Sequence, residues 1–222
     1  MNKETVIMTF IILVMSFILL IIFGLTNFLH FHKKKYNFLG NFPFELHSEY
    51  GMKINNYIRS LILLFVLSSI FYQIAVFSSV NIISHTVTIV FGSLCTLSIG
   101  MMFFVNLNNT KLHLLSVTLS LTLSILSFLS LVYLGLKTPL FIENEIVLYI
   151  LCGVFIAIQF SLIFFPQMKT WMNFKEVIND DGTVFYERGK YNFLSSLEWI
   201  IIFSHITYLL ISFIFIIPSF YI

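Results

Sequence analysis

The chain has 222 residues, of which 59% are hydrophobic and 10% are charged, and its formal net charge is +2. A soluble domain carries about 25% charged residues on average, because charged side chains solvate its surface. This composition therefore excludes a soluble globular protein and indicates an integral membrane protein. Its expected surroundings are membrane lipids, and no nucleic-acid partner is expected.

Six apolar runs are long enough to cross the hydrocarbon core, which takes about 20 helical residues. They cover residues 6–29, 61–80, 86–105, 114–136, 146–165 and 193–217. We predict a single all-α domain over residues 1–222, a compact six-helix transmembrane bundle. The first run is longer than the apolar part of an ordinary secretory signal and no small-residue cleavage site follows it, so we expect it to remain as a span.

Three consecutive spans carry small residues at every fourth position, a spacing that lets helix backbones approach closely in lipid. These residues are Gly92, Thr96 and Gly100; Ser116, Ser120 and Ser124; and Gly153, Ala157 and Ser161. The pattern predicts that spans three to five form the tight centre of the bundle. The two cysteines, Cys95 and Cys152, lie within predicted spans, so they do not indicate a disulfide framework.

The distribution of positive charge predicts the orientation, because cytoplasmic loops retain Lys and Arg. Of the 12 Lys and Arg residues, all except Lys3 and Lys137 fall in the first, third and fifth loops. The positive-inside rule therefore places these loops in the cytoplasm and both termini outside, in a cell membrane.

The first loop, residues 31–60, is the only long polar interruption in the first half of the chain. The Lys33–Lys35 run is interpreted as an orientation anchor, and the aromatic residues around Pro43 predict a bent segment that docks on the head groups. The acidic and histidine side chains of this loop, Glu45, His47 and Glu49, are candidate contacts. Their spacing matches no zinc motif, so we predict no metal site.

The fifth loop, residues 166–192, is the largest polar segment. Two β-prone runs flank Asp181 and Gly182, whose tolerance of positive φ favours a tight turn. This pattern predicts a small surface β-hairpin at about residues 174–187. Both this loop and the first loop are expected to offer a surface to a protein partner.

Few ionisable or amide side chains lie in the predicted spans, where each charged one costs about 2.5 to 3.5 kcal/mol on insertion scales. They are Glu198, His205, Gln73 and Gln159, with His113 at the head of the fourth span. Glu198 and His205 are seven residues apart and therefore lie on the same helical face. A functional interpretation makes these residues the lining of a polar cavity for a lipid head group, an ion or a proton. A structural interpretation pairs Glu198 with a loop lysine and makes His205 an interhelical hydrogen-bonding residue.

No nucleophile motif, phosphate-binding glycine loop or intramembrane hydrolase pattern is present, so nothing in the sequence supports catalysis or a cofactor.

The order of these features resembles the DRAM-like family of six-span membrane proteins, the damage-regulated autophagy modulators and their relatives. The resemblance rests on three short motifs, "PFELHSEYG", "NTKLHLLSV" and "SSLEWII". The matching positions are Pro43, Glu49, Gly51, His113, Glu198 and Trp199. The resemblance implies a membrane and lipid-associated role, and it implies cytoplasmic termini, opposite to the orientation that the charges predict.

Two classes of function remain open from the sequence. The first is a non-enzymatic membrane protein that binds or organises lipid or acts as a regulatory scaffold. The second is a small transporter or channel-like protein in which Glu198 and His205 relay a proton or an ion. No proline interrupts the spans, whereas many transporters use broken helices at the midplane.

Overall fold

The computed structural model describes residues 3–47, 55–78, 83–105, 109–137, 145–164, 175–178, 184–187 and 192–216. Its six long helices are all apolar and long enough to cross a membrane. They are α1 (Lys3–His32), α2 (Asn56–Phe77), α3 (Ile83–Phe104), α4 (Thr110–Lys137), α5 (Glu145–Ile163) and α6 (Phe193–Ile216). The chain is therefore a multi-pass membrane protein, as its composition predicts.

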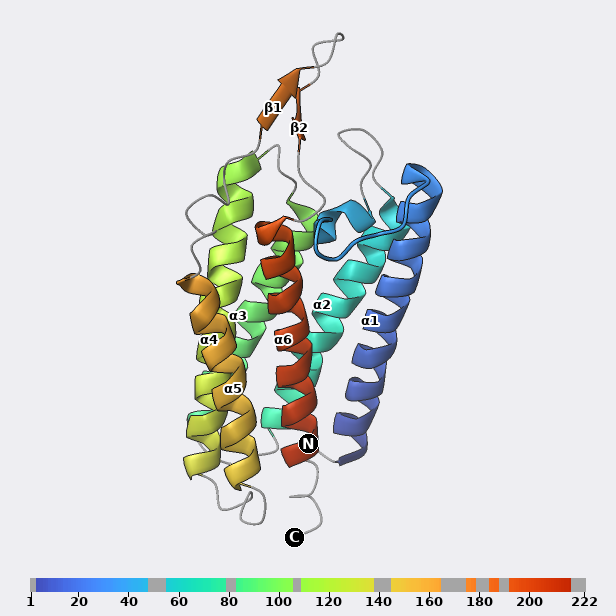
Figure 1. Ribbon diagram of the computed structural model, residues 1–222. Helices are drawn as coiled ribbons and strands as arrows, with labels where there is room; N and C mark the ends of the chain where they lie inside the picture. Colours follow the sequence, from blue (N-terminus) through green and yellow to red (C-terminus); the bar gives the residue numbers. More distant parts are fainter. Residues whose placement is uncertain are drawn as a thin grey trace.

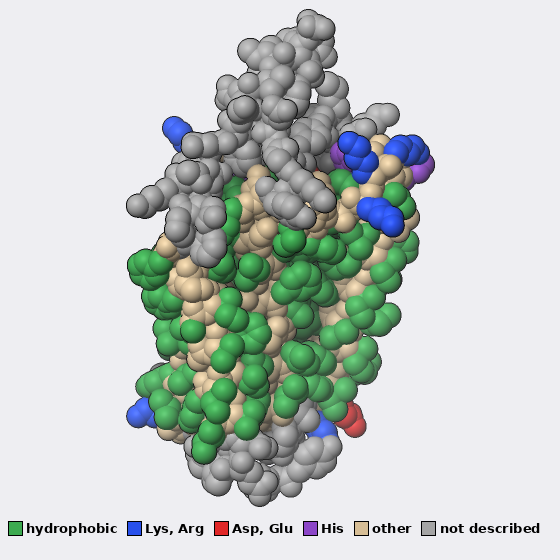
Figure 2. All heavy atoms as spheres, in the orientation of Figure 1, with side chains coloured by type: hydrophobic (Ala, Val, Ile, Leu, Met, Phe, Trp, Pro, Cys, Tyr) green, Lys and Arg blue, Asp and Glu red, His purple; other side chains and the backbone are tan. Residues whose placement is uncertain are grey.

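The helices form one bundle in which α6 lies between the α1–α2 side and the α4–α5 side (Figure 1). The closest packing joins α3 to α4 and α1 to α2. The start of α1 and the end of α6 lie at the same end of the bundle (Figure 1). Hydrophobic side chains cover the middle of the face seen in Figure 2, and Lys and Arg side chains appear at its two ends. This distribution matches a hydrocarbon layer around the middle of the bundle.

Asparagine side chains start three of the helices by accepting hydrogen bonds from first-turn amides. Asn55 Oδ1 accepts from Tyr57 N at 3.0 Å, and Asn192 Oδ1 accepts from Leu194 N at 2.9 Å. Asn109 Oδ1 accepts from Leu112 N at 3.3 Å. Such caps satisfy amides that have no partner within the helix. For this reason α2 and α4 begin before the apolar runs that predict their spans.

A short segment at one end of the bundle, residues 36–47, contains the single-turn 3₁₀ helix η1 (Pro43–Leu46). We call residues 36–47 the cap segment. Phe42, Phe44 and Leu46 are buried, so this segment packs into the end of the bundle instead of resting on head groups as its aromatic residues predict.

Two short strands, β1 (Lys175–Ile178) and β2 (Val184–Glu187), pair antiparallel in the fifth loop. Lys175 lies opposite Glu187, and Ile178 lies opposite Val184. The predicted turn residues Asp181 and Gly182 lie outside the described residues. The strands lie at the same end of the bundle as the cap segment (Figure 1).

Candidate functional site

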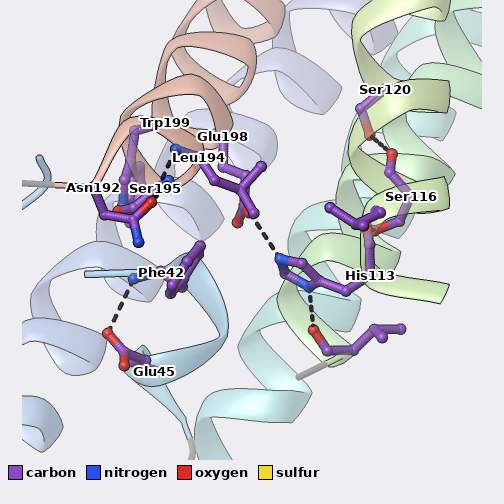
Figure 3. Close-up of polar contacts among 12 residues, drawn as sticks. Phe42, Glu45, His113, Ser116, Ser120, Asn192, Leu194, Ser195, Glu198 and Trp199 are labelled. Carbon is purple, nitrogen blue, oxygen red and sulfur yellow. Dashed lines mark hydrogen bonds and ion pairs between the residues drawn. The ribbon is translucent and has the colours of Figure 1, made fainter. Parts of the chain in front are cut away.

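A buried contact between a histidine and a carboxylate joins α4 to α6. His113 Nε2 lies 2.8 Å from Glu198 Oε1, and both side chains are 0% exposed. Asn109 and Asn192 cap the two helices, which places His113 in the first turn of α4 and Glu198 in the second turn of α6. Figure 3 shows the two side chains pointing toward each other across the gap between these helices.

The histidine is held from a second direction by backbone. Its Nδ1 atom lies 2.7 Å from the carbonyl oxygen of Val105, at the end of α3. This contact fixes the ring plane and leaves Nε2 for the carboxylate. The other oxygen of Glu198, Oε2, is buried and has no hydrogen-bond partner within the described part of the chain.

The cap segment covers this pair with two aromatic rings. Phe42 and Phe44 each lie 5.7 Å from the His113 ring between centroids, at interplanar angles of 86° and 87°. These edge-on arrangements are favourable aromatic geometries. They also separate the pair from the aqueous end of the bundle, since both rings are buried.

Hydrogen bonds to α6 hold the cap segment in place. The carbonyl oxygen of Asn41 accepts from Trp199 Nε1 at 3.0 Å and from the Ser195 hydroxyl. Within the cap segment itself, the Tyr36 hydroxyl donates to the carbonyl oxygen of Phe42 at 2.8 Å. Trp199 therefore closes the same end of the bundle as Glu198, its neighbour in sequence.

The cap segment is also joined to α3 and α1. His47 Nε2 donates to the carbonyl oxygen of Phe103, and Asn27 Nδ2 donates to the carbonyl oxygen of Leu46 at 2.8 Å. Burial lowers the pKa of His47, and the nearby positive charge of Arg59 lowers it further, against the opposing effect of its bond to Phe103. His47 is therefore held in its neutral form.

The two acidic candidates of the first loop differ in what the structure describes. Glu45 Oε2 accepts from Phe42 N at 3.0 Å and from Asn41 Nδ2 at 2.9 Å. These bonds shape the turn of the cap segment. Glu49 lies outside the described residues.

The other intramembrane candidates form two further groups. His205 Nε2 lies 2.8 Å from Thr96 Oγ1, which also accepts from Gln73 Nε2 at 2.9 Å. Gln159 Nε2 donates to Ser124 Oγ at 3.0 Å, between α5 and α4. His113 and Glu198 are thus directly paired. His205 and Gln73 instead share Thr96 as a partner, and Gln159 is bonded to Ser124. The hydrogen bonds described do not connect these groups.

An apolar groove lies between α1 and α6, and we call it the lateral groove. Its volume is about 240 Å³. It is lined by Phe10, Leu13, Val14, Phe17, Ile206, Leu209 and Leu210. The helix α1 packs chiefly against α2, which leaves this space between α1 and α6. Apolar cavities of this kind do not hold water.

Within the described residues, no group of three His, Cys, Asp or Glu side chains is placed to hold a metal ion. Comparisons with family models, with curated proteins and with solved structures found no match.

Some residues of the site carry no sequence signal. Asn41 and Ser195 are ordinary polar residues near a span, and Thr96 resembles any small residue of a packing stripe. Asn192, just before an apolar run, had a recognisable signal, since Asn is a preferred helix cap.

Proposed function

We propose that the protein is a non-enzymatic membrane protein that binds lipid and that one acyl chain occupies the lateral groove. The observation that carries this proposal is the groove itself. All seven lining side chains are apolar, and they come from two membrane-spanning helices. A hydrocarbon chain is the occupant that matches such a surface at such a depth.

The size of the groove supports one chain and not a whole lipid. Pockets for drug-sized molecules are about 300 to 1,000 Å³. The lateral groove, at about 240 Å³, is smaller. Affinity at this depth comes from dispersion contacts and not from removal of apolar surface from water, because the surrounding lipid is equally apolar.

A transporter has less support from the geometry. Glu198 and His205 are seven residues apart on α6, about 10 Å along the axis. Each is bonded to a different helix, Glu198 to α4 and His205 to α3. A proton relay between them lacks connecting groups in the described hydrogen bonds.

We further propose that the end bearing the cap segment faces the cytoplasm. The exposed lysines Lys33, Lys34 and Lys35 lie at this end, immediately after α1. Two observations support a partner surface there, the basic residues and the paired strands of the fifth loop. The resemblance to the DRAM-like family supports a lipid-associated role but favours the reverse orientation.

Filling the lateral groove tests the lipid proposal. The protein is placed in phosphatidylcholine vesicles containing a phospholipid with a photoreactive diazirine in its acyl chain. Cross-linked peptides are then mapped by mass spectrometry. The expected cross-links lie in residues 10–17 and 206–210. Leu210→Trp should lower their yield roughly threefold, as expected when about 0.7 kcal/mol of packing is lost.

The matched control is Leu129→Trp on α4. Leu129 is 46% exposed and Leu210 is 44% exposed, so the two substitutions place the same side chain on equally lipid-exposed positions. Only Leu210 lines the groove. Cross-links spread evenly over all the lipid-facing helices, with equal yields in both variants, would refute the proposal.

A further inference from the structure

The His113–Glu198 contact holds one proton, and this follows from its geometry. The carbonyl oxygen of Val105 only accepts, so the Nδ1 atom beside it must carry a hydrogen. Between Nε2 and Oε1, 2.8 Å apart, there is then room for one hydrogen. The contact is either an imidazolium with a carboxylate or a neutral imidazole with a carboxylic acid. Each form contains that single proton.

Loss of this proton would leave a lone pair on His113 Nε2 facing a lone pair on Glu198 Oε1 in a buried site without water. Both side chains are 0% exposed, and Glu198 Oε2 has no described hydrogen-bond partner to stabilise a carboxylate. A buried charge without partners is strongly unfavourable. Water would relieve it, but Phe42 and Phe44 separate the pair from water.

The cap segment itself carries an acidic side chain, Glu45. The charge of Glu45 acts on Glu198 and opposes a second negative charge there. The Oε2 atom of Glu45 is bonded to Phe42 N and Asn41 Nδ2 within the cap segment, while Arg59 of α2 acts on His47 at the end of that segment. On α4, the exposed side chain of Lys111 lies two positions before His113.

We propose that the His113–Glu198 contact is a one-proton latch that keeps the cap segment closed. With the proton bound, the contact is satisfied and the Phe42 and Phe44 rings pack over it. Without the proton, the carboxylate of Glu198 repels Glu45 and requires water, so the cap segment moves away from the end of the bundle. The attachments of the cap are hydrogen bonds to backbone carbonyls, which water replaces readily when the segment opens. This proposal does not depend on lipid in the lateral groove.

Thiol labelling measures the opening. Cys95 and Cys152 are replaced by Ala, and a reporter is introduced by Ser116→Cys. Ser116 is buried one turn beyond His113, and its hydroxyl donates to the carbonyl oxygen of His113, so cysteine is a mild change there. The labelling rate with a water-soluble maleimide is divided by that of Ser60→Cys, an exposed residue near the start of α2. This ratio removes the ordinary pH dependence of thiol reactivity.

The expected ratio in the parent protein is low near neutral pH and rises at alkaline pH, by about tenfold per pH unit once opening releases one proton. In Glu198→Gln the ratio should stay low. The Gln amide donates to His113 Nε2 without a titrating proton, so the latch stays closed. Leu210→Trp should leave the parent profile unchanged, which separates this proposal from lipid binding.

Two results would overturn the latch: a flat ratio in the parent protein up to about pH 10, or an unchanged alkaline rise in Glu198→Gln. Glu45→Gln is the second variant. It keeps an oxygen to accept from Phe42 N while removing a negative charge that repels the Glu198 carboxylate, so its alkaline rise should be smaller than that of the parent protein. If Glu198→Gln does not fold, the parent slope and the smaller rise in Glu45→Gln decide the question, and a rise of the same size in Glu45→Gln counts against the latch.

Discussion

At the scale of single residues, the packing of α3 against Gln73 of α2 depends on Gly92. A Cβ at this position would overlap Gln73 Oε1 and would lie 3.0 Å from the Tyr208 hydroxyl. The Gln73 amide is itself bonded to Ser69 and Thr96. The glycine therefore makes room for the polar group at the middle of the bundle.

Gly92→Ala should lower the free energy of unfolding by about 1 to 3 kcal/mol, because the new methyl group displaces the Gln73 amide from its partners. Unfolding by heat in detergent micelles, followed by circular dichroism, measures the change. Gly153→Ala is the matched control. No atom lies within 4 Å of a Cβ there, so this variant should be unchanged or more stable. Equal losses in both would contradict the packing argument.

The sequence singled out His113 and Glu198 separately but did not pair them. They are 85 positions apart. Hydropathy defines the length of each helix but not its rotation or its neighbour, so the partner of an intramembrane carboxylate is not visible in one sequence. For this reason the structural interpretation pairs Glu198 with a loop lysine, whereas its partner in the structure is His113.

At the scale of elements, the six spans are predicted to within a few residues, since an apolar run reports directly on a membrane helix. Their packing is less visible. Small residues predict that spans three to five form the centre, but Gly153 of α5 meets no neighbour, and α5 is largely exposed. Gly92 and Gly100 of α3 instead face Gln73 and Val66 of α2. A stripe shows where close packing is allowed, not which helix uses it.

The cap segment should loosen on acidification through His47. Burial holds the pKa of His47 below its ordinary value of 6.5, so its neutral form stabilises the folded state above that pH. The stability is lost as pH falls below about 6.5, by at most about 1.4 kcal/mol per pH unit for one proton. Thermal unfolding between mildly acidic and neutral pH measures this loss.

His47→Gln should reduce this acid sensitivity, because its amide can still donate to the carbonyl oxygen of Phe103 without taking up a proton. His30→Gln, on the exposed end of α1, is the control and should behave as the parent protein. An acid sensitivity that is the same in all three proteins would assign it to a group other than His47.

At the scale of the whole molecule, the ends of the bundle differ in charge. Lys33, Lys34, Lys35 and Lys111 lie at the end with the cap segment, and Lys3 and Lys137 lie at the other. The positive-inside rule then predicts which end faces the cytoplasm.

Single cysteines at Lys35→Cys and Lys137→Cys, in a background without Cys95 and Cys152, test the orientation. Both lysines are exposed, and each substitution removes one positive charge from its own end. A membrane-impermeant maleimide should label Lys137→Cys in intact cells and Lys35→Cys only after permeabilisation. The reverse pattern would favour the orientation that the DRAM-like resemblance implies.

The contacts between the cap segment and α6 also set an order of events during synthesis. Leu39 O accepts from Asn192 N at 2.8 Å, and the cap is bonded to Trp199 through Asn41. A nascent chain has the cap segment after its first span, but the α6 part of the surface that binds this segment is made only with the last span. Until α6 is inserted, His113 has no contact with Glu198, and the cap segment has no bond to Trp199. The sixth helix therefore completes the contacts at this end of the bundle.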